Sequence, residues 1–315
     1  MITFITKQKI NKLNSEIVLQ VRGVSKSIKG VPVLSDFGME VYKGSICGVV
    51  GPNDCGKTML LRTITALVNP DKGKIEIFGR NLIPYRSEIS SKLGLMIGEP
   101  VFYDHLTAFD NLAIFSRYSG GQKDNDEINR VLKLVNLSEL SDTKVKNFAS
   151  GDRKKLGIAM AIYGNPPLIL LDEPFVSLDL KSLIEIKTLL LTLNKQRGTT
   201  FVIASKQLSE LEGFIDRLVL MDGGSLIAEG NVDELTGRSK IGLLIDTSDN
   251  VMAFKILKES ELPIDSIIIE DELIRINCER ETIPFINKIL LVSDIQVYML
   301  KPDNVISSYY LTFTK

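Results

Sequence analysis

The chain carries a glycine-rich run, Gly51-Pro52-Asn53-Asp54-Cys55-Gly56-Lys57-Thr58, between an apolar stretch over residues 45–50 and a helical pattern over residues 58–68. A strand, a glycine loop and a helix in this order predict a phosphate-binding loop. Successive backbone N–H groups and the helix N-terminus would converge there on phosphate oxygens. Lys57 would add a positive charge and Thr58 a hydroxyl ligand for magnesium. For this run alone, a glycine-rich turn without a ligand remains an alternative.

A second run far along the chain makes the ligand more specific. It consists of Leu168-Ile169-Leu170-Leu171-Asp172-Glu173-Pro174, a short apolar segment that ends in two carboxylates. An apolar run bounded in this way is typical of a buried strand in an α/β domain. Together the two runs predict a site for ATP and Mg²⁺. The residues expected to bind the nucleotide there are Gly51, Pro52, Asn53, Asp54, Cys55, Gly56, Lys57, Thr58 and Met59.

Composition limits the partners and the compartment. The net charge of −1 gives no basic excess, so no nucleic acid is expected as a partner. Three cysteines, Cys47, Cys55 and Cys278, are odd in number and lack metal-binding spacing, which favours a reducing, cytoplasmic compartment. Residues 1–16 lack the apolar core of a secretory signal, and no stretch is apolar enough to span a bilayer. A role in transport would therefore need another chain to form the membrane path.

The order of strand-like and helical patterns predicts an α/β fold. Runs with strand character alternate with helical patterns, as in a domain whose helices cover a largely parallel sheet. Residues 107–164 form an exception, because apolar residues there recur at helical spacing and predict a helical subdomain. Examples of that spacing are Ile128, Val131, Leu132 and Val135. The strand-like runs are residues 17–21, 45–50, 74–78, 168–172, 200–204 and 217–221.

At 315 residues the chain exceeds the size at which a single core stops growing, about 250–300 residues. We expect an N-terminal extension over residues 1–16, a main domain over 17–238 and a small α+β accessory domain over 239–315. The last of these shows the order strand, helix, strand, strand, helix, strand, which suggests a ferredoxin-like fold. An irregular extension packed on the main domain is the alternative.

Four further segments follow the sequence order of one known family. Leu106–Leu112 is similar to that family's L-T-x-x-E-N-L, and Phe148–Ala159 occupies the place of its signature L-S-G-G-Q-x-Q-R and the following helix. Ser177–Asp179 and Ser205–Leu208 occupy the places of its D-loop and its switch histidine. The chain therefore resembles the ATP-binding subunit of an ABC transporter over residues 17–234. This implies a P-loop NTPase cassette with a mixed or parallel sheet core. Ser119–Gln122 also spells the signature, but no helix leading to residues 168–174 follows it.

The resemblance assigns chemical roles. Thr58 and Asp172 would hold Mg²⁺, and Glu173 would polarise the attacking water. Gly98 stands where the family has a glutamine that binds the metal, so the neighbouring Glu99 could bind magnesium only if the loop shifts its register. Lys206 replaces the histidine, and its ammonium can grip the γ-phosphate but lacks the two faces of an imidazole.

Other departures weaken contacts with the nucleotide. Asp54 replaces a loop glycine, and like charges about 6 Å apart at an effective dielectric constant near 20 repel by about 3 kcal/mol. Ile28 replaces an aromatic residue that stacks on adenine, and this replacement removes about 1 kcal/mol of stacking attraction. Ala149, followed by Ser150 and Gly151, removes a hydroxyl that would reach the γ-phosphate held by an opposing subunit. We therefore predict a slow ATPase.

A narrower similarity is to the ATPases of bacitracin and lantibiotic self-protection exporters. It depends on Met96–Pro100, on the signature run and on Ser307–Leu311. It implies two cassettes, identical or not, beneath transmembrane permease subunits at the inner face of the cell membrane, exporting a peptide antibiotic or other amphipathic compound. The alternative is a degenerate, regulatory cassette paired with a competent, non-identical ATPase subunit. DNA-repair and chromosome-organising ATPases are disfavoured, because no long coiled-coil heptads interrupt the cassette.

Two single residues have alternative interpretations. Cys55 would lie at a helix N-terminus beside Lys57, a setting that lowers a thiol pKa and makes the group reactive. The simpler alternative is that a small thiol fills the place of an alanine. His105, the single histidine of the chain, is interpreted as a solvated loop residue.

Overall fold

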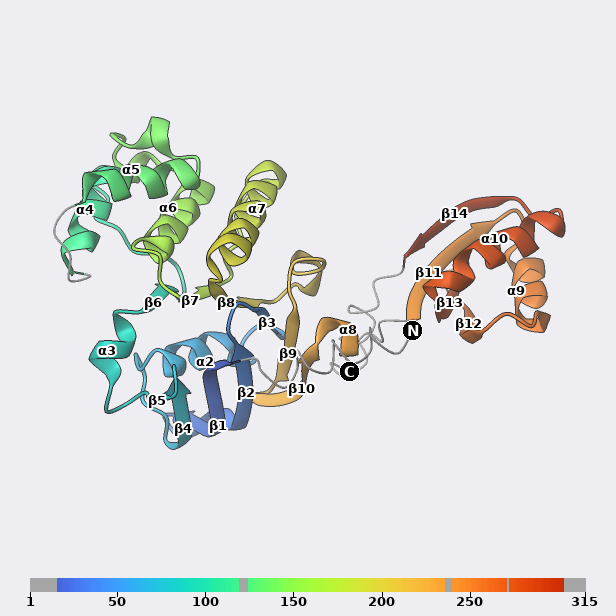
Figure 1. The fold of residues 1–315 in the computed structure, drawn as a ribbon, viewed down its shortest axis with the longest axis horizontal. Coiled ribbons are helices and arrows are strands. Elements are labelled where there is room, and N and C mark those ends of the chain that lie inside the picture. The colour runs from blue at the N-terminus through green and yellow to red at the C-terminus, as the bar shows by residue number, and fades with distance from the viewer. Residues whose placement is uncertain (1–15, 119–123, 236–239, 271, 303–315) are drawn as a thin grey trace. The chain divides into compact units, whose positions relative to one another are not determined.

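The computed structural model describes residues 16–118, 124–235, 240–270 and 272–302. The chain divides into two compact units, Met1–Glu229 and Gly230–Lys315. The first unit contains a largely parallel sheet, an antiparallel sheet and a group of helices, and the second contains one antiparallel sheet, two helices that pack on it and a further short helix (Figure 1). Two segments with family-like sequences, Ser119–Gln122 and Ser307–Leu311, lie outside the described residues.

The central sheet places two loops of the predicted site at one edge. Its strand order is β10-β9-β3-β8-β7-β6, and the pairs from β9 through β6 are parallel. Every residue of β3, β7 and β8 is buried, as expected where helices or other layers cover both faces of a sheet. The carboxyl ends of parallel strands meet at one edge, so the residues after β3 and β7 lie near each other. The strands are β3 (Ile46–Val50), β6 (Leu93–Met96), β7 (Leu168–Asp172), β8 (Thr200–Ser205), β9 (Arg217–Asp222) and β10 (Ser225–Asn231).

The first unit also contains an antiparallel sheet, and one of its strands lies beside the glycine-rich loop. It has the order β2-β1-β4-β5, with β1 (Ile17–Ile28), β2 (Val31–Tyr42), β4 (Lys72–Ile77) and β5 (Arg80–Asn81). The sequence did not predict β2, because Pro32, Asp36 and Gly38 interrupt its alternating pattern. The structure accommodates them with shifts in the β1–β2 register, and Asp36 has φ 47°.

Helix α2 (Lys57–Ile64) lies in the core that joins these two sheets, and its Leu60, Leu61 and Ile64 are fully buried. The helical subdomain contains α4 (Ala108–Tyr118), α5 (Asn125–Leu134) and α6 (Ser150–Ile162) (Figure 1). In α5 the buried residues are Ile128, Val131 and Leu132, which confirms the helical spacing seen in the sequence. Among the described residues of this unit, the remaining helical elements are α3 (Arg86–Ser90), α7 (Leu180–Arg197) and short 3-10 turns at Ser138–Leu140, Val145–Asn147 and Leu208–Glu210.

The second unit follows the element order expected from its sequence. An antiparallel sheet with strand order β12-β13-β11-β14 packs against two helices. Ala253 and Leu257 of α9 and Ile286 and Leu290 of α10 are buried in its core. The elements are α8 (Val232–Leu235), β11 (Lys240–Thr247), α9 (Asn250–Glu259), β12 (Ile264–Glu270), β13 (Leu273–Glu279), a 3-10 turn (Arg280–Thr282), α10 (Ile283–Val292) and β14 (Val297–Pro302).

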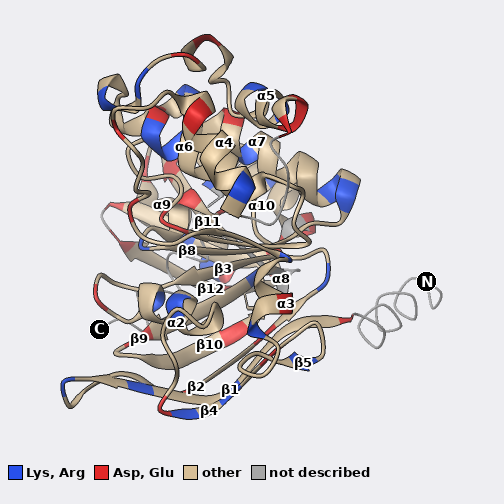
Figure 2. Ribbon diagram, turned by 90° about the vertical axis from the view of Figure 1, so that its left-hand side faces the viewer, with Lys and Arg blue, Asp and Glu red and all other residues tan. Residues whose placement is uncertain are grey.

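Charge and apolarity of the elements agree with the composition. Figure 2 shows acidic and basic residues interspersed along helices and strands. In the described ranges, no helix combines the length and the apolar character needed to cross a membrane.

Candidate functional site

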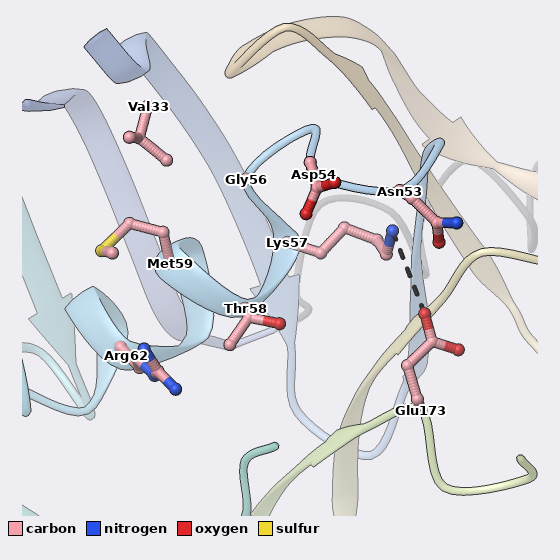
Figure 3. A pocket seen from close by; sticks show the side chains of 9 residues that line it. All are labelled: Val33, Asn53, Asp54, Gly56, Lys57, Thr58, Met59, Arg62 and Glu173. Atoms are coloured by element: carbon pink, nitrogen blue, oxygen red, sulfur yellow. Dashed lines mark ion pairs between the residues drawn. The ribbon is translucent and has the colours of Figure 1, made fainter. Parts of the chain in front are cut away.

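A cavity of about 430 Å³ opens at the edge where β3 and β7 end (Figure 3). The loop that leaves β3 after Val50 forms its floor and passes directly into α2. Glu173, the residue after β7, stands on the opposite wall. The complete lining is Val33, Asn53, Asp54, Gly56, Lys57, Thr58, Met59, Arg62 and Glu173. The two sequence runs that predicted the site therefore meet in one cavity.

Two glycines let the loop lie close against its neighbours. A Cβ at Gly51 would stand 2.3 Å from the carbonyl oxygen of Met221. At Gly56 it would stand 2.7 Å from the carbonyl oxygen of Val33, and Gly56 has φ 104°, where side chains are strained. The loop is also held from β9–β10 by a 2.9 Å hydrogen bond that the Gly224 N–H donates to the carbonyl of Cys55. These contacts explain why the loop needs glycine at these two positions.

Lys57, the first residue of α2, is a buried cation at the end of the loop. Its side chain is 6% exposed, and its Nζ donates to the carbonyl oxygens of Gly51 and Pro52, each at 2.8 Å. The same Nζ lies 3.9 Å from Glu173 Oε1 (Figure 3). A buried ammonium held by two carbonyls and facing one carboxylate gives the cavity a fixed positive charge, suited to phosphate oxygens.

Thr58 and Asp172 form the candidate magnesium site. Thr58 Oγ1 donates to Asp172 Oδ2 at 2.7 Å, and the Gly98 N–H donates to the same oxygen at 3.2 Å. Within the described part of the chain, Asp172 Oδ1 is buried without a hydrogen-bond partner. A buried carboxylate oxygen left unpaired is costly, and hydroxyl and carboxylate oxygens are ligands that Mg²⁺ prefers. These residues therefore fit the ion.

A magnesium ion here would need oxygen atoms from another molecule. Among the described residues, no group of three or more His, Cys, Asp and Glu side chains could hold a metal ion. Mg²⁺ normally binds proteins through one or two carboxylates together with waters and substrate phosphates. One carboxylate and one hydroxyl beside a loop of N–H groups match that pattern.

Glu173 is held on the cavity wall with a basic carboxylate. Its backbone N–H donates to the carbonyl of Ala204 at 2.9 Å, and its φ is 47°. The pKa of the Glu173 carboxyl is raised, chiefly by burial and also by the charges of Asp172 and Glu210, although the backbone hydrogen bond from Lys206 and the charge of Lys57 act in the opposite direction. A carboxylate with a raised pKa accepts a proton from water more readily, which suits a general base.

Asp54 lies on the cavity in a left-handed backbone conformation. Its φ is 59°, a region that glycine adopts without strain and that aspartate tolerates better than most residues. Figure 3 shows its side chain extending from the loop alongside Lys57. The Asp54 carboxylate therefore lies on the cavity, as the sequence predicts.

Several residues nominated from the sequence lie outside the cavity lining. Ile28 is 43% exposed at the end of β1, and Val33 of β2 lines the cavity instead. Lys206 is exposed, and only its backbone reaches Glu173. Ala149 is the N-cap of α6 and forms no side-chain capping bond; Ser150 follows it on the surface, and Gly151 is half-buried.

The register shift that would bring Glu99 to the metal is not present in this part of the structure. The Gly98 N–H, not a Glu99 oxygen, contacts Asp172. The Glu99 carboxylate instead lies 3.3 Å from Lys154 Nζ. The expected metal ligand is thus a partner of helix α6 in this conformation.

Two lining residues were missed in the sequence. Arg62 lies four residues after Thr58 on α2, so helical spacing alone could have placed it on the same face. Val33 comes from β2, the strand that the sequence did not predict. No local signal could have connected it to the loop.

Cys55 and His105 have simple environments. Cys55 is 4% exposed, and burial raises the pKa of its thiol despite the nearby Lys57. This favours the interpretation of Cys55 as a small apolar filler over that of a reactive thiol. His105 is exposed and packs edge-on against Tyr103, as expected for a solvated loop residue.

Comparison with known proteins agrees with this geometry. Residues 34–176 match the family model described as ABC transporter. The chain is 33% identical over 281 residues to the uncharacterized ABC transporter ATP-binding protein YcbN of Bacillus subtilis (strain 168), covering 89% of this chain and 91% of that one. It is also 33% identical over 273 residues to the bacitracin transport ATP-binding protein BcrA of Enterococcus faecalis, covering 87% and 88%.

A solved structure shows the same fold. The ATP-binding cassette MJ0796, in a dimeric post-hydrolysis state bound to ADP and phosphate, superposes with a TM-score of 0.64 at 23% identity, covering 68% of this chain and 98% of that chain. The fold is that of an ABC cassette, with an additional C-terminal antiparallel sheet. The chain belongs to the ATP-binding proteins of ABC transporters.

Proposed function

We propose that the protein binds ATP with Mg²⁺ in the 430 Å³ cavity and hydrolyses it slowly to drive transport through separate membrane subunits. The observation that carries the proposal is that buried Lys57 faces Glu173 across one cavity, while Thr58 of the same lining is hydrogen-bonded to Asp172, whose Oδ1 is buried without a partner. The backbone of residues 51–59 binds the phosphates. Thr58 and Asp172 hold Mg²⁺, which when bound neutralises phosphate charge. Glu173 accepts the proton of the attacking water.

Slow turnover follows from contacts that these residues lack. Phosphoryl transfer depends on positioning and charge stabilisation, so each missing γ-phosphate contact raises the barrier. Ala149 offers no hydroxyl to an opposing cassette, and Lys206 is an ammonium where an imidazole would link phosphate and water. We expect a kcat below about 1 per second for the purified protein, whereas the median enzyme reaches about 10 per second. Phosphate release at tens per second would contradict this.

Substitution of Asp54 tests the proposed phosphate position. Replacing Asp54 with glycine is expected to tighten Mg–ATP binding by about tenfold, because it removes a carboxylate that repels the phosphates by up to about 3 kcal/mol before magnesium screens it. Titration calorimetry would measure the two dissociation constants. Asp54→Asn is the matched control, since it removes the charge but keeps the side chain. It should recover most of the gain, and unchanged affinity in both variants would place the phosphates elsewhere.

The proposed partners are a second cassette and transmembrane permease subunits at the inner face of the cell membrane. The proposed cargo is a peptide antibiotic or another amphipathic compound, moved outward. This rests on the similarity to BcrA, a bacitracin transport protein, and on the sequence similarity to self-protection exporters. Affinity purification from membranes of the native host, followed by sequencing of the proteins recovered, tests the partners. Growth in bacitracin with and without this gene tests the cargo.

A regulatory cassette paired with a competent, non-identical ATPase subunit is the second candidate. Ala149 favours it, because at the N-cap of α6 it forms no side-chain hydrogen bond and offers no hydroxyl to the opposite site. Recovery of a second cassette with serine and histidine at these positions would support this candidate. Recovery of this chain alone with permeases would support the slow homodimer.

We also propose that residues 17–238 form the cassette and 239–315 an accessory domain of ferredoxin-like fold. The element order β11-α9-β12-β13-α10-β14 and the antiparallel strand order β14-β11-β13-β12 support this assignment.

A further inference from the structure

The helical subdomain contains a buried cation that the proposed chemistry does not use. Lys154 of α6 is 2% exposed, and its Nζ lies 3.3 Å from the carboxylate of Glu99. The Glu99 side chain itself is 83% exposed. Lysine is rarely buried to this extent, because moving an ammonium out of water is unfavourable unless an anion compensates it. Glu99 therefore holds its own backbone close to α6, because its exposed side chain pairs with the buried Lys154.

That backbone leads directly to the candidate magnesium site. Gly98 precedes Glu99, and its N–H donates to Asp172 Oδ2 at 3.2 Å. The same oxygen accepts the hydroxyl of Thr58 at 2.7 Å. With Oδ2 occupied by two donors, the buried Oδ1 is the oxygen left for a metal ion. The orientation of the Asp172 carboxylate thus depends on where the Gly98 peptide lies.

The backbone from Met96 to Pro100 is closely confined by its neighbours. Gly98 has φ 71°, a left-handed conformation. A Cβ at Gly157 of α6 would stand 3.0 Å from side-chain atoms of Pro100 and 2.9 Å from the sulfur of Met96, so the helix packs directly on both ends of the segment. The Lys154–Glu99 pair adds a third contact between α6 and this backbone, between the contacts at Met96 and Pro100.

We propose that Lys154 is a positioning residue for magnesium. By holding Glu99 it fixes the Gly98 N–H, which orients Asp172 and presents Oδ1 to the ion. This inference rests on the proposed function and assigns α6 a role in metal affinity. Removing a partner that orients a metal ligand lowers affinity by about 10- to 100-fold in other metal sites.

The test measures Mg²⁺ affinity apart from nucleotide affinity. Wild type, Lys154→Met and Glu99→Gln are titrated with a fluorescent ADP analogue, first in EDTA and then at increasing Mg²⁺. Methionine keeps the unbranched length of lysine without its charge. We expect the apparent Mg²⁺ constant to weaken by about tenfold in both variants, with the metal-free ADP constant changed less than about twofold. Lys133→Met, an exposed lysine of α5, should match wild type.

A double-mutant cycle separates positioning from general destabilisation. If the two side chains act as one pair, the double variant should be no worse than Lys154→Met alone, because residues in contact are not additive. Unchanged Mg²⁺ affinity in both single variants, or fully additive losses, would overturn the inference. Glu99→Gln changes an exposed side chain, so the test stands even if Lys154→Met fails to fold. Absence of ADP binding by wild type would instead refute the proposed function.

Discussion

ATP hydrolysis by the Glu173→Gln variant is expected to fall by about a hundredfold or more, while ATP binding persists. A positioned general base contributes about 10²- to 10⁴-fold to a rate, and a glutamine of the same shape cannot accept the proton of water. The amide keeps the volume that Glu173 fills on the cavity wall, so the loop around Lys57 should remain in place. Steady-state phosphate release and calorimetry with Mg–ATP measure the two effects separately.

The exposed Glu139→Gln is a control for loss of a carboxylate elsewhere on the surface. Hydrolysis by Glu173→Gln within tenfold of wild type would contradict the role of general base. The wild-type pH profile gives a second check. Because burial raises the pKa of Glu173 above its ordinary value of 4.5, the Glu173 carboxylate should become protonated as pH falls through a value higher than 4.5. In a plot of kcat against pH, the fall in rate on the acid side should therefore have its midpoint above pH 4.5.

Replacing Lys57 with methionine is expected to weaken Mg–ATP binding by about a hundredfold. A hydrogen bond to a charged group contributes about 1.5–3 kcal/mol, and the ammonium is the buried positive charge between the loop and Glu173. The substitution also leaves the carbonyls of Gly51 and Pro52 without a donor they now have. Titration calorimetry measures the affinity, and thermal unfolding reports the effect on the fold.

Lys181→Met, in which an exposed lysine of α7 loses its charge, is the matched control and should bind as wild type does. A dissociation constant for Lys57→Met within about threefold of wild type would show that the phosphates do not contact this ammonium.

The sequence predicted the parts of the fold that are specified locally. The strands β3, β7, β8 and β9 are short apolar runs because both faces of the central sheet are covered, and such runs are visible without any partner. The loop before α2 needs its glycines at fixed spacing, so it can also be recognised from the sequence. The strand β2 was missed, because its irregular register with β1 hides the alternation by which a strand is recognised.

The site was predictable where one segment supplies it and less so where distant segments combine. Lys57 and Thr58 were placed on the cavity as expected. Glu99 was not, because its position depends on Lys154, a residue of α6 that is distant in sequence and whose burial no local pattern reveals. Similarly, Val33 enters the cavity because β2 crosses over the loop, which is a consequence of sheet packing.

The close approach of Gly51 to β9 links the ligand site to the interior. Met221 presses its carbonyl and side chain toward Gly51, and the tip of the same side chain lies 3.4 Å from the position of a Cβ on Gly56. Methionine is flexible and fills irregular gaps, so the Met221 side chain supports the loop at both Gly51 and Gly56. Met221 is 1% exposed, so we expect substitutions at this buried residue to change the width of the loop.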